Sequence, residues 1–237
     1  MTSHDSPSPS RPSLNSALLE ARHVARRHPD GESWLLEDVS LRIEPGTQVL
    51  LAGPSGSGKT LLLRAMALLD PIDQGQVLWQ GEAVGAEAIP GFRASAIYLH
   101  QRPSLLEEDV EAALKRPFSL ATHRQRRFDR DAVVGWLEPL GRDASLLEKR
   151  CTDLSGGERE IVALVRALQL SPNILLLDEP TAALDPPTAE GVEKLLGDWL
   201  AEAPQSRALV WVTHRTEQGQ RVADQTFRIR AGRIDHE

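Results

Sequence analysis

A glycine-rich segment between an apolar run and a helical pattern constrains the fold of this chain more than any other feature. Residues 53–60 read Gly-Pro-Ser-Gly-Ser-Gly-Lys-Thr and directly follow the apolar run at residues 47–52. Apolar residues then recur at helical spacing over residues 61–69, and Pro71 blocks further extension. A buried strand that passes through such a loop into a helix is typical of an α/β domain, in which ligands bind at the carboxyl ends of the strands.

The residue types in this loop suit a phosphate group. Glycines let backbone N–H groups close around phosphate oxygens, and the following helix adds the positive end of its dipole. Lys59 can reach the β and γ phosphates of a nucleotide, and the Thr60 hydroxyl can hold Mg²⁺. Eight residues are therefore predicted to bind the nucleotide: Gly53, Pro54, Ser55, Gly56, Ser57, Gly58, Lys59 and Thr60.

Three further apolar runs predict more strands of the same sheet. Residues 96–100, 173–178 and 208–213 are apolar runs that end in polar residues, as buried strands of a parallel sheet do. Residues 102–153 show helical rather than strand patterns. The sequence therefore predicts one α/β domain over residues 17–237, with a mainly parallel core sheet and a small helical insertion at about residues 102–153.

Composition excludes several classes of protein. A formal net charge of −7 argues against a nucleic-acid partner, which usually requires a basic face, and against charge-driven attachment to an anionic membrane. The apolar runs are far shorter than the roughly 20 residues that cross a bilayer. The single cysteine excludes an intrachain disulfide and fits a reducing compartment. Residues 1–16 are rich in Ser and Pro and predict a disordered tail, and we expect the chain to be cytoplasmic.

Two adjacent carboxylates follow the apolar residues 174–177. Asp178 can hold Mg²⁺ through its water shell, and Glu179 can orient and deprotonate an attacking water. Adjacent acids at a strand end can also cap a helix or lie at a solvated surface. Their position downstream of a phosphate loop favours the catalytic interpretation.

The sequence Leu154-Ser-Gly-Gly-Glu158, together with the loop and the acidic pair, resembles the signature of the ATP-binding-cassette (ABC) ATPases. As local structure it predicts a helix N-terminus with Ser155 near the cap. The resemblance implies an ABC-type phosphate-loop NTPase fold with an antiparallel N-terminal β-subdomain. It also implies a homodimer, or a pair of cassettes, with composite ATP sites between the phosphate loop of one subunit and Ser155, Gly156 and Gly157 of the other.

Further positions match the family in the same order along the chain. Gln101 resembles the Q-loop glutamine that senses Mg²⁺ and the γ-phosphate, and Asp185, in Ala183-Leu184-Asp185, resembles the D-loop that crosses the dimer interface. His214 resembles the switch histidine that contacts the γ-phosphate and positions the water. The resemblance thus implies catalytic roles for Glu179, His214 and Gln101, and metal ligation by Thr60, Gln101 and Asp178.

Two positions depart from the family pattern. Members usually have an aromatic residue upstream of the phosphate loop that stacks on adenine; here the position holds His28, with Trp34 as a second candidate, and the contact is open among His28, Trp34 and neither. Glu160 stands where many members have Gln. The hydrolytic residues are all present, which argues against a nucleotide-gated binding module without turnover.

A motor driven by ATP needs something to move. The resemblance implies separate transmembrane permease subunits on the inner face of the cell membrane, with residues 101–117 as their docking region. The stretch Tyr98-Leu-His-Gln-Arg-Pro-Ser-Leu-Leu-Glu107, the short insertion and Trp211-Val-Thr-His214 are similar to the iron-export type of bacterial ABC ATPase. The alternative is a soluble ABC ATPase that remodels a protein complex. The transported solute, the direction of transport and the membrane partner stay open at this point.

Overall fold

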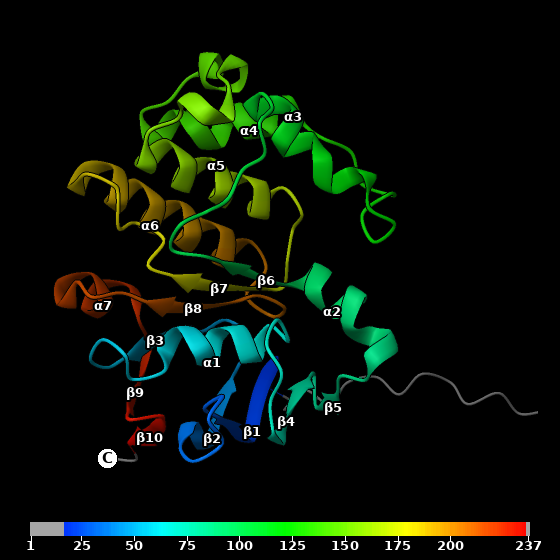
Figure 1. Ribbon diagram of the computed structural model, residues 1–237. Coiled ribbons are helices and arrows are strands. Elements are labelled where there is room, and N and C mark those ends of the chain that lie inside the picture. The colour runs from blue at the N-terminus through cyan, green and yellow to red at the C-terminus, as the bar shows by residue number, and fades with distance from the viewer. Residues whose placement is uncertain (1–16, 236–237) are drawn as a thin grey trace, which may run out of the picture.

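The computed structural model describes residues 17–235, and the predicted tail at residues 1–16 lies outside them. Within the described residues two sheets form the framework (Figure 1). The larger sheet has six strands in the order β10-β9-β3-β8-β7-β6, and the smaller has four strands in the order β2-β1-β4-β5. Helices cover both faces of the larger sheet, with α5 and α6 on one side and α1 on the other.

The six-stranded sheet confirms the predicted, mainly parallel core. Neighbouring strands from β9 to β6 pair in parallel, and β10 pairs antiparallel with β9 at the edge. Every residue of β7 and β8 is buried, because helices cover both faces. The strands of this sheet are β3 (Gln48–Ala52), β6 (Ala96–Leu99), β7 (Ile174–Asp178), β8 (Ala208–Val212), β9 (Gln225–Arg230) and β10 (Arg233–Asp235).

The four-stranded sheet is antiparallel, as the resemblance implied. Its strands are β1 (Leu19–Arg27), β2 (Trp34–Ile43), β4 (Gln74–Trp79) and β5 (Glu82–Ala83). The register of β1 shifts near His23, which has a positive φ of 51°. At Gly75 of β4 an added Cβ would lie 2.2 Å from the carbonyl oxygen of His23, so the close approach of the two strands requires glycine there.

Seven α-helices are described: α1 (Lys59–Met66), α2 (Ile89–Ser95), α3 (Val110–Lys115), α4 (Arg130–Leu137), α5 (Gly156–Leu168), α6 (Pro186–Glu202) and α7 (Thr216–Val222). Short 3₁₀ turns are η1 (Ala86–Ala88), η2 (Arg116–Ser119), η3 (Glu138–Leu140), η4 (Ala144–Glu148) and η5 (Cys151–Asp153). Helix α1 is shorter than the periodicity at residues 61–69 indicates, because Leu68 has a positive φ of 54°. None of the described helices combines the length and apolar character needed to cross a membrane.

The core lies in two clusters on opposite faces of the large sheet. Leu175 and Leu177 of β7 belong to the cluster that includes α5 and α6. Ile174 and Leu176 belong to the cluster that includes α1 and the antiparallel sheet. This alternation follows from the two-residue period of a strand. Burial on both sides holds the carboxyl end of β7, and hence the acidic pair, in a fixed position.

The segment between β6 and β7 is helical, with α3, α4 and α5 and the turns η2 to η5. It forms the upper part of the molecule in Figure 1. Asp109 and Arg150 make an isolated antiparallel bridge within it. Helices α3 and α4 fall within the residues for which a helical insertion is predicted, and the single-domain assignment stays a prediction.

Candidate functional site

The phosphate loop connects β3 with α1 and depends on glycine at two points. Gly53 has a φ of 151°, and a Cβ added there would lie 2.2 Å from the carbonyl oxygen of Ile229 in β9. Gly58, at the N-cap of α1, has a φ of 107°. Residues with a side chain rarely adopt these conformations, and glycine adopts them readily. Glycine therefore occurs where the loop must turn tightly against β9 and enter the helix.

The Lys59 side chain folds back over this loop and is 6% exposed. Its Nζ donates hydrogen bonds to the carbonyl oxygens of Gly53 and Pro54, both at 2.8 Å. Burial lowers the pKa of Lys59, and the carboxylates of Glu179 and Asp178 oppose that shift. The ammonium group is thus placed at the centre of the loop, where it can exchange carbonyl oxygens for phosphate oxygens.

Asp178, at the end of β7, is 3% exposed, and one of its carboxylate oxygens accepts hydrogen bonds from two hydroxyl groups. Thr60 Oγ1 donates to Asp178 Oδ2 at 2.8 Å, and Tyr98 Oη donates to the same oxygen at 2.9 Å. Burial and the Asp178 carboxylate raise the pKa of Tyr98, so the phenol keeps its proton and remains a donor. Thr60 and Asp178, both predicted metal ligands, are therefore in direct contact.

Glu179 brings the other predicted catalytic residues together. Its Oε1 lies 2.8 Å from His214 Nε2, and its Oε2 accepts a hydrogen bond from Gln101 Nε2 at 3.1 Å. The backbone at Glu179 is left-handed, with a φ of 52°, and its N–H donates to the Val212 carbonyl oxygen at 2.9 Å. These contacts join the ends of β6, β7 and β8 at one carboxylate.

A cavity of about 390 Å³ joins the phosphate loop to these strand ends. Its lining includes Ser55, Gly56, Gly58, Lys59, Thr60, Glu179 and His214. Gly53, Pro54 and Ser57 complete the loop without lining the cavity. Part of the phosphate loop therefore shares one hollow with Glu179 and His214 at the carboxyl edge of the sheet, whereas Gln101 and Asp178 do not line it.

The signature residues lie elsewhere on the chain, at the start of α5. Ser155 is the N-cap: its Oγ accepts from Glu158 N at 3.2 Å, and Glu158 Oε2 accepts from Ser155 N at 2.9 Å. This is the capping box that the sequence indicates. Ser155 and Gly156 are exposed, and Ser155, Gly156 and Gly157 do not line the cavity. Within one chain, the structure does not bring the signature to the phosphate loop.

Most of the described chain matches a known family. A family model described as ABC transporter matches residues 36–182. The chain belongs to the ABC transporter family. It is an ATP-binding ATPase of the ABC type, and the predicted family, fold and ATPase activity are confirmed.

Relatives of this ABC ATPase include proteins named for export and for import. It is 34% identical over 200 residues to the probable iron export ATP-binding protein FetA of Escherichia coli (strain K12), covering 84% of this chain and 86% of that one. It is 36% identical over 225 residues to the sulfate/thiosulfate import ATP-binding protein cysA of Cucumis sativus, covering 92% of this chain but 61% of that protein. A solved dimeric bacterial ABC transporter cassette is 25% identical, with a TM-score of 0.80 and coverage of 92% and 97%.

The predicted D-loop residue Asp185 caps helix α6 of the ABC ATPase. Its Oδ1 accepts from Thr188 N at 2.9 Å, and that N–H lowers the pKa of Asp185. The preceding turn packs on the signature: a Cβ added at Gly157 would lie 3.0 Å from the Ala183 carbonyl oxygen. The two segments predicted to contact a second subunit are therefore side by side on one surface.

Glu160 of α5 binds the backbone of the turn that precedes Asp185. It is 6% exposed, and its Oε1 and Oε2 accept from Ala183 N at 3.0 and 3.1 Å. Burial raises the pKa of Glu160 to about 7; the Ala183 N–H and Arg215 oppose the shift, and Glu179 adds to it. Its sequence position signalled only a departure from the family. The contact with Ala183 gives it a structural role that the sequence did not predict.

The adenine contact stays an open prediction. His28 lies after β1, half exposed, with Nδ1 2.7 Å from Asp30 Oδ2. One face of the Trp34 ring is covered by the Arg27 guanidinium, 4.2 Å from the ring centroid. Neither His28 nor Trp34 lines the cavity, and Leu35 does.

The residues present fit ATP with Mg²⁺. Within residues 17–235 no cluster of three or more His, Cys, Asp or Glu side chains could hold a metal ion. Mg²⁺ commonly uses one or two protein oxygens and completes its shell with water and substrate phosphates. Thr60 and Asp178 supply such oxygens, and Ser57 Oγ is buried without a hydrogen-bond partner inside the loop. The donor set therefore suits a metal carried by the nucleotide.

Proposed function

We propose that this chain is the ATP-hydrolysing subunit of a membrane transporter and works as a dimer with two composite ATP sites. The observation that supports it best is the Glu179 carboxylate, contacted by His214 on one oxygen and Gln101 on the other beside the phosphate loop. A carboxylate oriented on both sides and open to a cavity suits a group that must align one water with a phosphorus atom.

In the proposed reaction, Lys59 and the loop bind the phosphates, and Glu179 orients the attacking water. The water oxygen forms a bond to the γ-phosphorus, the bond from that phosphorus to the β–γ bridging oxygen breaks, and ADP leaves with that electron pair. The water proton passes to Glu179, while His214 holds the carboxylate in place and contacts the γ-phosphate. Mg²⁺ held by Thr60, Asp178 and Gln101 would neutralise charge on the phosphate oxygens.

The proposed dimer rests on the separation of the two motifs within one chain. Ser155 and Gly156 are exposed, next to Asp185 and away from the cavity. A helix N-terminus attracts an anion, so a second subunit could present its α5 to the γ-phosphate. The solved cassette with 25% identity is dimeric. ATP would contribute these contacts only in the closed dimer, and hydrolysis would remove them.

The proposed partners are transmembrane permease subunits, docked near residues 101–117, which would place the chain on the cytoplasmic face of the membrane. Among the solutes we infer iron or another metal, exported, because the chain spans 86% of the length of FetA but 61% of that of cysA. The resemblance at residues 98–107 supports the same assignment. A soluble complex-remodelling ATPase is the competing function.

The decisive test uses Glu179→Gln with the tagged chain in its native cells. This variant should bind ATP, hydrolyse it about 100- to 10,000-fold more slowly, and accumulate dimers, since it loses the group that activates water but keeps the size of the side chain. Turnover, ATP binding and molecular mass by light scattering measure the three properties. A variant that stays monomeric in saturating ATP would contradict the composite site.

The same trapped complex separates the competing functions. Purification from gently solubilised membranes should recover a polytopic membrane protein in stoichiometric amount. Recovery of soluble partners alone, from preparations in which other membrane complexes remain intact, would favour the remodelling ATPase. Cells expressing Glu179→Gln in place of the normal chain should retain more iron than normal cells; unchanged iron content would contradict the inferred solute.

A further inference from the structure

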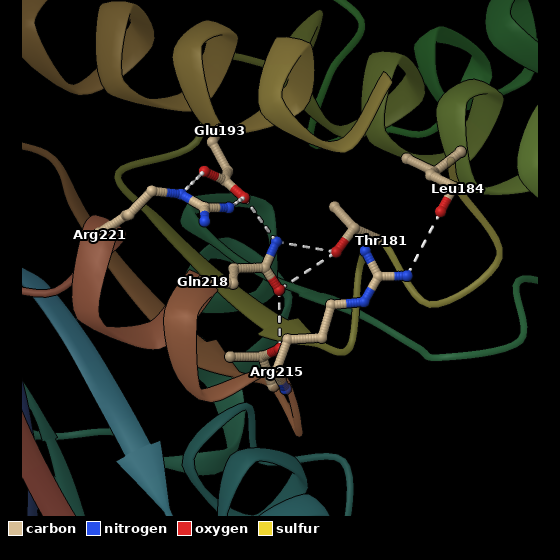
Figure 2. Close-up of polar contacts among 7 residues, drawn as sticks. Thr181, Leu184, Glu193, Arg215, Gln218 and Arg221 are labelled. Carbon is tan, nitrogen blue, oxygen red and sulfur yellow. Dashed lines mark hydrogen bonds and ion pairs between the residues drawn. The ribbon is translucent and has the colours of Figure 1, made fainter. Parts of the chain in front are cut away.

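One buried amide, that of Gln218, joins the loops that follow β7 and β8. Figure 2 shows Gln218 among its partners. Gln218 of α7 is 2% exposed. Its Nε2 donates to Thr181 Oγ1 at 3.0 Å and to Glu193 Oε1 at 2.9 Å, and its Oε1 accepts from Thr213 Oγ1 at 2.7 Å. Both N–H groups and the carbonyl of the amide are therefore engaged, each with a different element.

Two of these partners adjoin the proposed catalytic residues. Thr181 follows Glu179 by two positions after β7, and Thr213 immediately precedes His214 after β8. Thr213 Oγ1 also accepts from the backbone N–H of Arg215 at 3.1 Å. The hydroxyl of Thr213 thus fixes the turn around His214 on one side and contacts Gln218 on the other.

The connection continues to the turn before Asp185. The Arg215 guanidinium donates from Nη2 to the carbonyl oxygen of Leu184 at 3.3 Å, as Figure 2 shows. Leu184 is buried, and the next residue, Asp185, is exposed. The segment around His214 is therefore tied both to the loop of Glu179 and to the turn that precedes Asp185.

Helix α7, which carries the amide, packs closely against β3. A Cβ added at Gly219, the residue after Gln218, would lie 2.8 Å from Leu50 Cδ2 in β3. On the outer side, Arg221 Nη2 and Nε donate to Glu193 Oε1 and Oε2 at 2.9 and 3.1 Å. The Glu193 side chain is 11% exposed and the Arg221 side chain 49%. The ion pair thus closes the outer end of the network, and the amide lies at its centre.

We propose that Gln218 is a positioning residue for ATP hydrolysis, which holds the Glu179 loop and the His214 loop in one fixed arrangement. This rests on the proposed roles of Glu179 and His214. Gln218 acts through Thr181 and Thr213, and the hydrogen bonds of its amide go to these residues and Glu193 rather than to the phosphate loop. Its loss should therefore slow the chemical step and leave ATP affinity almost unchanged.

The size of the effect follows from geometry. Removal of the amide takes one hydrogen-bond partner from each of the Thr181 and Thr213 hydroxyls, while Glu193 Oε1 keeps its bond from Arg221 Nη2. The two hydroxyls must then move to find another partner. A misplacement of about 1 Å at a catalytic group costs up to about 100-fold in rate. Glu179 and His214 touch at 2.8 Å, so small shifts of either loop change their contact directly.

Gln218→Met tests the proposal because it keeps the length of the side chain and removes all three hydrogen bonds. Turnover at saturating ATP should fall about 10- to 100-fold, while the Kd for a fluorescent ATP analogue stays within about threefold of the unchanged protein. Arg221→Gln is the matched control: it removes the ion pair at the outer end of the network, where Arg221 is half exposed, leaves the bonds of the Gln218 amide in place, and should keep turnover within about twofold. A parallel loss of ATP affinity, or normal turnover in Gln218→Met, would overturn the proposal.

A second comparison separates this inference from the proposed function. In a Glu179→Gln background, Gln218→Met should lower the residual rate by less than about twofold, because the group that it positions is already disabled. A full additional loss there would show that Gln218 acts independently of Glu179 and would overturn the proposal. A fully active Glu179→Gln protein would instead contradict the catalytic assignment itself.

If Gln218→Met does not fold, Thr213→Val, which removes one hydroxyl, should show the same split with about a 3- to 10-fold loss of turnover.

Discussion

The two halves of the proposed ATP site are built in different ways. The phosphate-loop half consists of residues 53–60 with Asp178, Glu179 and His214, and its central groups are buried and joined by contacts distant in sequence, such as Thr60 with Asp178. The signature half consists of residues 155–157 and 183–185; its two helix caps, Ser155 and Asp185, bond to neighbours three residues away, and Glu160 accepts from the Ala183 N–H. One half therefore depends on the whole fold, and the other is a pair of capped helix ends on the surface.

The difference separates the expected consequences of mutation. Changes in the phosphate-loop half should alter the binding or cleavage of ATP by each subunit. Changes in the signature half should leave ATP binding by the single subunit intact and weaken the closed dimer. The variants below test these two expectations.

The largest effect is expected from Lys59→Ala. The phosphate charge loses its main cationic partner, so the Kd for ATP should rise at least about 100-fold, the equivalent of about 2.7 kcal/mol. Equilibrium binding of a fluorescent ATP analogue measures it. Lys194→Ala removes an exposed lysine of α6 and is the control. Near-normal affinity of Lys59→Ala would count against the phosphate-loop assignment.

A smaller and different effect is expected from Ser155→Ala in the Glu179→Gln background. The hydroxyl that caps α5 would also face the partner's γ-phosphate, and hydrogen bonds to charged groups contribute about 1.5–3 kcal/mol. The dimer should dissociate about 10-fold more readily or more, while ATP binding by the monomer is unchanged. Sedimentation at several protein concentrations measures this, with exposed Ser206→Ala as the control. Equal dimer affinity would remove the signature from the proposed site.

Tyr98→Phe tests whether the Tyr98 hydroxyl helps to orient the Asp178 carboxylate for Mg²⁺. It removes one of two donors to Asp178 Oδ2 and keeps the ring, at a cost of about 1 kcal/mol in the arrangement that receives Mg²⁺. The Mg²⁺ concentration for half-maximal turnover should rise about fivefold. ATP binding in a chelator should be unaffected. An unchanged Mg²⁺ dependence would mean that Thr60 alone suffices to orient Asp178.

The last prediction concerns stability and pH. Burial raises the pKa of Glu160 to about 7 from an unfolded value of 4.5, so the folded protein binds the proton more tightly than the unfolded chain. The stability that this group contributes is complete below pH 4.5 and is lost as the pH rises through 7. Glu160→Gln keeps an acceptor for the Ala183 N–H and removes the titration. The free energy of unfolding of the variant, relative to the unchanged protein, should therefore rise between pH 4.5 and 7 and level off above, as urea titrations at several pH values would measure. A pH-independent difference would contradict this.

Local chemistry made the phosphate-loop strand, the capped signature helix and the acidic strand end predictable from sequence. Each depends on residues within about ten positions, where glycine conformation, apolar periodicity and capping act directly. Helix α1 was overestimated because the turn at Leu68 breaks a pattern that apolar periodicity alone extends. The antiparallel sheet came from the family resemblance rather than from strand patterns.

The supporting residues were not predictable in the same way. Tyr98 meets Asp178 across 80 positions, and Gln218 meets Thr181 across 37, so their roles arise only when strands and helices pack. A buried polar residue gives no periodic signal, and a tyrosine at the end of an apolar run is equally consistent with the core. Gln101, Glu179 and His214 were candidates from the sequence, and they meet in the structure because all three follow neighbouring parallel strands.

The left-handed backbone at Glu179 lowers the folding stability of the protein at a residue that is proposed to act in catalysis. A side chain in that conformation costs roughly 1 kcal/mol relative to glycine, and the Val212 carbonyl holds it there. A chain selected for resistance to unfolding alone would place glycine at this position and gain stability. The glutamate lies where the backbone disfavours it, so the strained residue at this strand end is also the one on which the proposed hydrolysis depends.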